Sequence, residues 1–305
     1  MSPASSSAPP PSWLPLFTPA ELGRLARAAE SEAPILILGQ PGTGRSSLAR
    51  WLHARSRRAG RLLVEVDAVA LPASLFEAEL FGYRAGAFTG AEASLDGRVA
   101  RAQGGSLLLD RLESLPLPVQ PKLLRLLAEG RYSPLGGRER EADVRFLAIA
   151  DEDLSLRVER GTFRSDLYYR LEVLTFRLPP LAERKARLAE VVASLLEDLG
   201  ARLGERPPEL DPAAWTWMER YGWPGNLRQL RNVLERALIL QPGAPLAPPP
   251  PVDLAGERPR PLAELEEGEI RRALAYTRGH QAEAAALLGI SRKSLWERRR
   301  RYGIA

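Results

Sequence analysis

The sequence contains no cysteine, only two histidines, and no run of about 18 apolar residues, the length that a transmembrane helix requires. The absence of cysteine excludes disulfide bonds, iron–sulfur clusters and a thiol nucleophile. The two histidines, His53 and His280, lie far apart in the sequence, so we do not expect a zinc site. We therefore expect a cytoplasmic protein that does not associate with a membrane.

Positive charge is concentrated near the C-terminus. The whole chain of 305 residues has a formal net charge of +5. The segment 291–301 alone has six basic residues and one glutamate, which also gives a net charge of +5. A basic patch confined to one end of a chain predicts a polyanionic partner for that end.

A glycine-rich loop, Gly39–Ser47, follows the short apolar run Ile35–Leu38 and precedes a stretch with helical spacing. A strand, a glycine loop and a helix in this order form a unit whose backbone N–H groups bind phosphate. The loop matches the pattern G-x-x-x-x-G-K-[ST], except that Arg45 stands in place of lysine. The alternative interpretation is a plain glycine-rich turn. The residues expected to contact nucleotide phosphates are Gly39, Gly42, Thr43, Gly44, Arg45, Ser46 and Ser47.

Strand patterns alternate with helical patterns along the first part of the chain. Strands are predicted over 61–67, 106–110, 144–150 and 173–178, and helices over 75–81 and 119–129. This alternation predicts an α/β fold, in which a parallel sheet has helices on both faces.

Composition divides the chain into five segments. Residues 1–15 are rich in Ser, Ala and Pro and are expected to form a disordered tail. The α/β part occupies 16–180, and helical patterns alone occupy 181–241. Residues 242–260 begin with six prolines in ten residues, which predicts an extended linker. The last segment, 261–305, is long enough for a small helical domain.

Several motifs lie around the predicted strand that ends in Asp110, a position where a carboxylate holds Mg²⁺ beside a phosphate loop. The hexapeptide Gly86–Ala91 reads GAFTGA, and the segments 163–171 and 223–230 read FRSDLYYRL and WPGNLRQL. With these motifs the sequence resembles the bacterial sigma-54-dependent transcriptional activators, which are AAA+ enhancer-binding proteins. The resemblance extends over roughly residues 16–305 and implies an AAA+ core, an α-helical lid and a Fis-type helix-turn-helix domain.

The resemblance implies ATP and Mg²⁺ as ligands, with Asp110 holding the metal and Arg228 in the lid touching the nucleotide. It also implies a ring of subunits, in which Arg164 and Arg170 reach the nucleotide of the neighbouring subunit. A permanently charged, planar guanidinium suits that task. The alternative for each arginine is an ordinary surface salt bridge.

The GAFTGA hexapeptide is implied to contact sigma-54 RNA polymerase. Glycines give this loop flexibility, and an exposed phenylalanine gives it an apolar anchor for another protein. The alternative is an internal turn with a buried phenylalanine. The residues of the loop are Gly86, Ala87, Phe88, Thr89, Gly90 and Ala91.

The sequence departs from the family where hydrolysis takes place. Arg45 replaces the phosphate-loop lysine, and Arg111 replaces the glutamate that polarises the attacking water. Asp67 replaces an asparagine, and Ala150 and Asp151 replace a threonine followed by asparagine or histidine. Because arginine cannot accept a proton, fast ATP hydrolysis by this chain alone is not expected.

Two of the departures are complementary in charge. Asp67 and Arg111 could form a charge-assisted pair that holds the site in one state. The alternative is independent change at a site that is no longer needed. Nucleotide binding is a separate property, and the loop glycines, Asp110 and Arg228 are retained for it.

The C-terminal segment has the pattern of a helix-turn-helix. A short Ala/Leu helix over 282–288 is followed by a turn at Gly289, and Ser291 can cap a basic helix over 292–302. The start of that helix is expected to reach base edges of double-stranded DNA, and its later arginines are expected to contact phosphates. A merely solvated basic helix is the alternative. The candidate DNA-binding residues are Arg292, Lys293, Ser294, Arg298, Arg299, Arg300 and Arg301.

Two functions remain open at this point. The first is a working ring ATPase that remodels sigma-54 RNA polymerase. The second is a DNA-binding regulator that does not hydrolyse ATP and modulates active rings or assembles with them. Only about 15 residues precede the core, too few for a sensory domain, so we expect control by expression level, by a separate partner, or no control at all.

Overall fold

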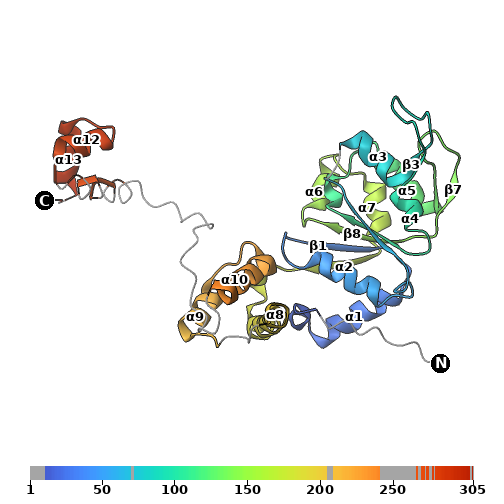
Figure 1. The fold of residues 1–305 in the computed structure, drawn as a ribbon, viewed down its shortest axis with the longest axis horizontal. Coiled ribbons are helices and arrows are strands. Elements are labelled where there is room, and N and C mark those ends of the chain that lie inside the picture. Colours follow the sequence, from blue (N-terminus) through green and yellow to red (C-terminus); the bar gives the residue numbers. More distant parts are fainter. Residues whose placement is uncertain are drawn as a thin grey trace. The chain divides into compact units, whose positions relative to one another are not determined.

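The computed structural model describes residues 11–69, 72–204, 209–240, 266, 269–271, 273–274, 277, 279–302 and 304. Residues 1–249 and 250–305 form two separate compact units (Figure 1). The predicted linker, 242–260, lies outside the described residues, as do residues 1–10 of the predicted tail.

A five-stranded parallel sheet forms the centre of the first unit. Its strand order is β2-β5-β8-β1-β9, and every neighbouring pair is parallel. The strands are β1 (Ile35–Gly39), β2 (Leu63–Asp67), β5 (Ser106–Asp110), β8 (Arg145–Ala150) and β9 (Leu174–Leu178). The α/β fold expected from the sequence is confirmed, and each of these strands matches a predicted one.

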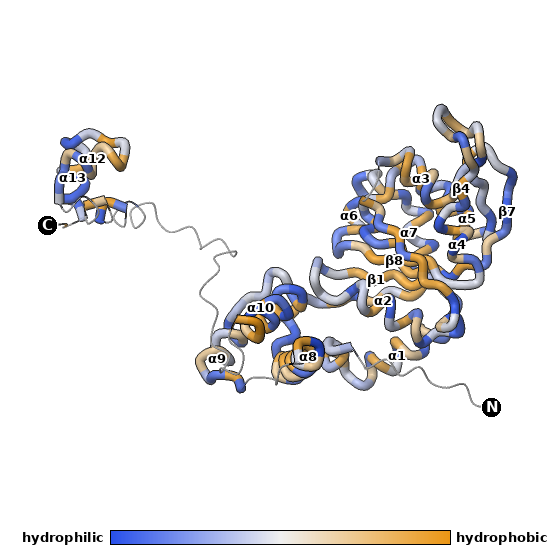
Figure 2. The backbone as a smooth tube through the Cα atoms, in the orientation of Figure 1, coloured by the Kyte–Doolittle hydropathy of each residue, from blue (hydrophilic) through white to orange (hydrophobic). Residues whose placement is uncertain are grey.

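Helices cover both faces of the sheet because successive side chains of a buried strand point to opposite sides. In β1, Ile35 and Ile37 join one apolar core, whereas Leu36 and Leu38 join the other. Figure 2 shows these strands as predominantly hydrophobic. On the first face lie α1 (Pro19–Glu30) and α2 (Arg45–Ala54), and on the second lie α3 (Ala73–Phe81), α4 (Arg98–Arg101), α5 (Gln120–Glu129), α6 (Leu154–Glu159) and α7 (Ser165–Leu171).

Two short hairpins extend from the described residues of the α/β part. The sequence patterns did not predict them. One pairs β3 (Gly82–Tyr83) with β4 (Leu95–Asp96), and the other pairs β6 (Arg131–Tyr132) with β7 (Arg140–Glu141). Strands of two residues are too short to show an alternating pattern in a sequence.

The helical lid shares the core of the first sheet face. Leu188, Trp223 and Leu227 pack in the same apolar cluster as Leu48 of α2. The lid contains the 3₁₀ turns η3 (Leu181–Glu183) and η4 (Lys185–Arg187) and the helices α8 (Leu188–Leu203), α9 (Pro212–Arg220) and α10 (Asn226–Leu240).

The disordered tail was predicted to reach residue 15, but its last residues are ordered in the structure. Trp13 is 8% exposed and packs in the core beside Phe17, with a ring-centroid distance of 5.6 Å. The 3₁₀ turn η1 (Leu14–Leu16) follows it and contacts α8. An aromatic residue with apolar neighbours can bury enough surface to order this segment, although its surroundings are Ser- and Pro-rich.

The second unit is a small helical domain. Its helices include α12 (Gln281–Leu287) and α13 (Arg292–Arg301), and its apolar core contains Ile270, Leu274 and Leu295. None of the helices in the described part of the chain is long and apolar enough to span a membrane.

Candidate nucleotide-binding site

The glycine-rich loop connects β1 to α2 at the carboxyl end of the sheet. Gly42 and Gly44 have φ angles of +83° and +98°, which a residue with a side chain adopts only under strain. A Cβ atom at Gly42 would lie 2.3 Å from the carbonyl oxygen of Gly225 in the lid. Helix α2 begins at Arg45, within this segment, so its first N–H groups and its positive dipole end lie at the loop.

A cavity of about 710 Å³ opens beside this loop, with walls from the sheet, α2 and the lid. It brings together most of the predicted nucleotide and catalytic positions. Its lining includes Gly42, Gly44, Arg45, Ser46, Ser47, Asp67, Asp110, Arg111, Asp151 and Arg228. Gly39, Thr43 and Ala150 do not line the cavity, and Ala150 is completely buried in β8.

The lid is closed onto the loop. The Nδ2 of Asn226 donates to the carbonyl of Pro41 at 3.1 Å, and the N–H of Arg228 points to the carbonyl of Gly42 at 3.4 Å. Asn226 in turn accepts a hydrogen bond from the N–H of Leu181 at 2.7 Å, where the lid begins. The start of α10 is therefore anchored both to the phosphate loop and to the beginning of the lid.

Asp67 and Arg111 form the ion pair that their charges suggested. The Nε of Arg111 donates to Oδ1 of Asp67 at 2.7 Å, and one Nη donates to the other carboxylate oxygen. Asp67 and Asp110 are register partners at the ends of β2 and β5. Asp110 accepts hydrogen bonds from the N–H of Arg111 at 2.8 Å and from the hydroxyl of Ser46 at 3.2 Å.

The two partners shift each other's pKa in opposite directions. Burial alone would raise the pKa of Asp67, but the hydrogen bonds and charge of Arg111 outweigh it and lower that pKa. The hydrogen bond to Asp67 raises the pKa of Arg111, and the nearby charge of Asp110 adds to the rise. Both side chains are therefore charged at neutral pH.

Arg45 and Asp151 form a second pair, which the sequence did not reveal. Arg45 is only 9% exposed, and its Nη1 lies 2.7 Å from Oδ1 of Asp151 and 2.5 Å from the carbonyl oxygen of Ala150. The guanidinium thus reaches across the cavity floor to the end of β8. Four of the residues that differ from the family therefore form two ion pairs, Asp67 with Arg111 and Arg45 with Asp151.

Sequence reasoning missed Glu113, which lines the same cavity. It lies in the 3₁₀ turn η2 (Leu112–Ser114) and is 7% exposed, and its carboxylate accepts the N–H of Asp151 at 3.2 Å. Burial raises the pKa of Glu113, and the negative charge of Asp151 adds to the rise. The only sign of this role in the sequence was its position three residues after Asp110.

An apolar wall of the cavity was also missed. Trp13, Leu195 and Leu227 line it, from the N-terminal segment, α8 and α10. The remaining lining residues are Ser12, Pro41, Arg50 and Arg231. Only Trp13 gave a signal in the sequence, as a lone aromatic residue in a Ser- and Pro-rich segment.

The two predicted finger arginines do not line the cavity of their own subunit. Arg164 pairs with Asp166, with its Nη2 2.7 Å from Oδ2. Arg170 donates to the carbonyl oxygens of Leu127 and Ala128, at the C-terminal end of α5. Arg164 is exposed, so it is accessible to another subunit, and its role stays a prediction.

The GAFTGA loop forms the tip of the β3–β4 hairpin, which Figure 1 shows protruding from the α/β part. Gly86 and Gly90 have φ angles of +81° and +96°. The side chain of Phe88 is 43% exposed and contacts Tyr83 edge-on, with ring centroids 5.0 Å apart. The phenylalanine is thus held at the tip without being buried.

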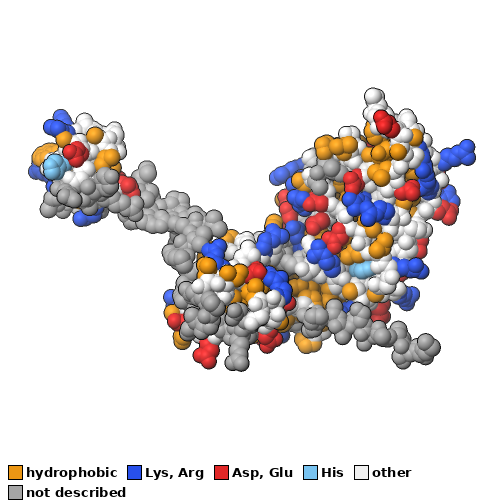
Figure 3. All heavy atoms as spheres, viewed as in Figure 1, with side chains coloured by type: hydrophobic (Ala, Val, Ile, Leu, Met, Phe, Trp, Pro, Cys, Tyr) orange, Lys and Arg blue, Asp and Glu red, His pale blue; other side chains and the backbone are white. Residues whose placement is uncertain are grey.

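The C-terminal helix α13 starts as predicted, because the hydroxyl of Ser291 accepts the N–H of Ser294 at 3.1 Å. Leu295 is completely buried, whereas Trp296 is exposed. Figure 3 shows Lys and Arg side chains on the surface of this unit.

Not all basic residues of α13 are equally free. Arg292, Lys293, Arg300 and Arg301 are exposed, whereas Arg298 and Arg299 are half-buried. Arg298 forms an ion pair with Glu266 inside the domain. A phosphate contact by Arg298, which the sequence predicted, therefore competes with this internal partner.

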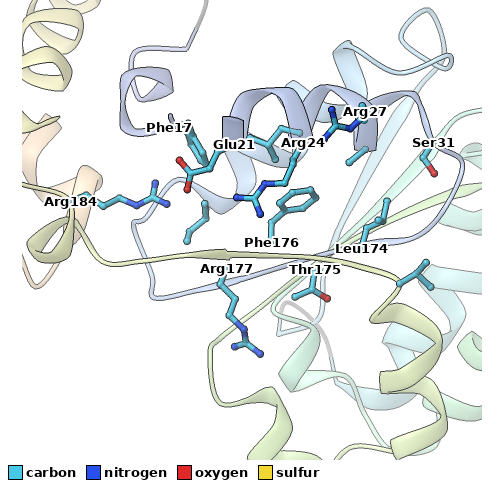
Figure 4. Close-up of a pocket in the computed structure, with 14 residues that line it drawn as sticks. Phe17, Glu21, Arg24, Arg27, Ser31, Leu174, Thr175, Phe176, Arg177 and Arg184 are labelled. Atoms are coloured by element: carbon cyan, nitrogen blue, oxygen red, sulfur yellow. The ribbon is translucent and has the colours of Figure 1, made fainter. Parts of the chain in front are cut away.

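A second cavity, of about 520 Å³, lies between α1 and the edge strand β9 (Figure 4). None of the predicted site residues lines it. Figure 4 shows Arg24 of α1 next to Phe176 of β9, and Glu21 of α1 directed toward Arg184. Burial opposes ionisation of Glu21, but hydrogen bonds from Thr18 and the charge of Arg184 lower its pKa overall.

Comparisons with known families agree with the geometry. The sigma-54 interaction domain matches residues 19–177, more than half of the chain. The chain belongs to the sigma-54-dependent activator family. The AAA+ ATPase lid domain matches residues 182–249, and the bacterial regulatory protein domain of the Fis family matches residues 261–302. The core is thus an AAA+ P-loop fold with a helical lid, followed by a Fis-type helix-turn-helix.

Individual relatives cover nearly the whole chain. It is 38% identical over 297 residues to the regulatory protein AtoC of Escherichia coli, covering 92% of this chain and 64% of AtoC. It is 40% identical to the alginate biosynthesis transcriptional regulatory protein AlgB of Pseudomonas aeruginosa, covering 91% and 64%. NtrX from Brucella abortus in complex with ATP is 30% identical with a TM-score of 0.70, covering 92% and 66%. The chain spans less than two thirds of the length of these two curated relatives.

Proposed function

We propose that this protein is a DNA-binding regulator of sigma-54-dependent transcription whose AAA+ core binds ATP. The observation that carries the proposal is the cavity beside Gly42 and Gly44, which gathers the phosphate loop, the strand-end carboxylates and the closed lid. We further propose that Phe88 and Thr89 contact sigma-54, and that the protein assembles into rings. As a DNA-bound regulator, it acts in the cytoplasm.

The cavity offers suitable groups for both the phosphates and the base of a nucleotide. Loop N–H groups and the start of α2 suit the phosphates, and Arg228 adds a positive charge to the wall. Trp13 and Leu227 offer apolar surface for the base, as nucleotide sites usually do. NtrX, solved in complex with ATP, is similar over 92% of this chain, and this supports the same ligand here.

Nucleotide binding is tested by titrating the full chain with a fluorescent ATP analogue. We expect saturable binding, and Arg228→Ala should weaken it by about tenfold, the loss of one charge-assisted hydrogen bond. Arg220→Ala, at an exposed position in the same lid, is the matched control and should bind as the wild type does. Equal affinities of the wild type, Arg228→Ala and Arg220→Ala would show that Arg228 does not contact the nucleotide.

DNA binding is proposed for the exposed side of α13. The helix presents Arg292 and Lys293 near its start and Arg300 and Arg301 near its end, and we propose that two such domains bind as a dimer. In salt titrations with duplex DNA, Arg300→Ala should reduce the slope of log affinity against log salt by about 1. Arg298→Ala should reduce it less, because Arg298 already pairs with Glu266. Equal effects would reject this division of roles.

A second candidate function is favoured by the two ion pairs in the cavity. With Arg111 held by Asp67 and Arg45 held by Asp151, the subunit binds ATP without hydrolysing it and offers Arg164 and Arg170 to an active neighbour in a mixed ring. The test mixes the chain with an active family member. Faster phosphate release by the mixture, lost with Arg164→Ala, supports co-assembly, whereas unchanged release argues against it.

A further inference from the structure

The carboxylates at the strand ends already have a positively charged partner. Asp67 and Asp110 lie side by side as register partners on β2 and β5, where two negative charges would repel each other. The guanidinium of Arg111 clamps both oxygens of Asp67, and its charge also acts on Asp110. Arg111 therefore supplies the positive charge that a metal ion would otherwise bring to adjacent carboxylates.

Each carboxylate oxygen of Asp110 already accepts a hydrogen bond from the protein. One carboxylate oxygen accepts the N–H of Arg111 at 2.8 Å, and the other accepts the hydroxyl of Ser46 at 3.2 Å. Ser46 is the other residue that would hold Mg²⁺ in a phosphate-loop site. The two expected ligands are thus bonded to each other, and a guanidinium is the neighbouring charge.

Magnesium does not fit this set of donors. Mg²⁺ requires near-octahedral oxygen ligands and is usually bound by one or two carboxylates together with phosphates and waters. Here one carboxylate is neutralised by Arg111, and the position that carries a glutamate in the family carries a cation. A divalent ion held by both Asp110 and Ser46 would compete with the hydrogen bond between them and lie close to the like charge of Arg111.

We propose that the cavity binds the nucleoside triphosphate free of divalent metal, with Arg228 and the N–H groups of the loop holding the phosphates. Arg228 lines the cavity beside the loop, whereas Arg111 and Arg45, which also line it, are paired with Asp67 and Asp151. A guanidinium group binds phosphate oxygens in bidentate geometry and is always charged, so Arg228 can supply part of the charge that a metal ion would bring to the phosphates. The inference rests on the proposed nucleotide site and specifies the form of nucleotide that it accepts.

The experiment compares the affinity of the full chain for a fluorescent ATP analogue in excess EDTA and in excess MgCl₂. We expect the two dissociation constants to agree within about threefold, or the EDTA value to be the lower. An affinity weaker in EDTA by about tenfold or more overturns the inference and leaves the nucleotide site standing. Absence of binding in both buffers overturns the inference together with the proposed nucleotide site.

A double variant sharpens the comparison. Asp67→Asn with Arg111→Glu removes the internal cation and adds a carboxylate beside Asp110, so MgCl₂ should now strengthen binding by about tenfold or more. Arg160→Glu makes the same arginine-to-glutamate change at an exposed turn outside the cavity and should leave the wild-type ratio unchanged. The same ratio in wild type and double variant contradicts the role of Arg111. If the double variant does not fold, the wild-type comparison still decides.

Discussion

The nucleotide cavity and the GAFTGA hairpin have diverged from the family to different extents. In the hairpin, all six residues of the motif are present, and Phe88 is exposed at the tip. In the cavity, the phosphate loop keeps its glycines, but charged side chains around it have been exchanged and pair with one another. The surface expected to touch another protein is retained, whereas the groups expected to activate water are not.

This difference teaches that binding and hydrolysis depend on separable parts of the site. Loop backbone, closed lid and apolar wall are built from the fold and need few particular side chains. Water activation needs a base at one position, and we propose that Arg111 occupies that position. Variants of the cavity and of the hairpin test this contrast separately.

The largest expected effect comes from repairing the cavity. Asp67→Asn with Arg111→Glu restores a carboxylate that can accept a proton, and loss of a general base typically costs 10²–10⁴ in rate. We therefore expect phosphate release in MgCl₂ to rise by about 100-fold. The control is Arg160→Glu, at an exposed turn, which should stay at the wild-type rate. If the double variant releases phosphate no faster, Arg111 is not what blocks hydrolysis.

The hairpin is tested by Phe88→Ala. An exposed aromatic anchor at an interface typically contributes about 2 kcal/mol, so affinity for sigma-54 should fall by about 30-fold. Nucleotide affinity should not change, because Phe88 does not line the cavity. Leu156→Ala is the matched control, since Leu156 is equally exposed, at 44% against 43%. Equal losses in both variants would indicate a general effect on stability.

The contact between loop and lid is tested by Gly42→Ala. The added Cβ would meet the carbonyl oxygen of Gly225 at 2.3 Å, so the lid must move away and nucleotide affinity should fall by about tenfold. Gly161→Ala is a close control, because Gly161 also has a positive φ, of +70°, but open space around it. Both should lose about 1 kcal/mol of stability from backbone strain, and Gly42→Ala should lose more because the lid is displaced. An unchanged nucleotide affinity of Gly42→Ala would show that the contact between lid and loop does not contribute to nucleotide binding.

The smallest effect concerns pH. The pKa of Asp67 is lowered in the folded protein, so its pair with Arg111 stabilises the fold above the ordinary aspartate pKa and is lost as the pH falls. Both side chains are about two-fifths exposed, and solvent screening limits the contribution to below about 1 kcal/mol. The difference in unfolding free energy between wild type and Asp67→Asn should therefore shrink as the pH falls below about 4. A difference that grows in acid would contradict the pair.

The sheet and the phosphate loop could be predicted from local patterns, since apolar runs and loop glycines act through the backbone. The pairing of Asp67 with Arg111 could be proposed because their charges are complementary and family positions place them together. The pairing of Arg45 with Asp151 could not, because 106 residues separate them and the direction of a long side chain depends on packing.

Other features escaped the sequence for related reasons. Trp13 is ordered by contacts with residues that come much later in the chain. The ion pair of Arg298 could not be predicted from its basic helix, because its partner Glu266 lies in another part of the domain. Composition predicts the charge of a helix, and only the tertiary structure shows which charges are already paired.

The central claim is that the cavity retains ATP and does not hydrolyse it. The most direct measurement incubates the purified chain with ATP and MgCl₂, isolates the bound nucleotide by rapid gel filtration, and identifies it by ion-exchange chromatography. We predict that the bound nucleotide is intact ATP, with ADP formed no faster than in buffer alone. Steady formation of ADP, approaching the turnover of about 1 per second or more that is typical of enzymes, would contradict the account.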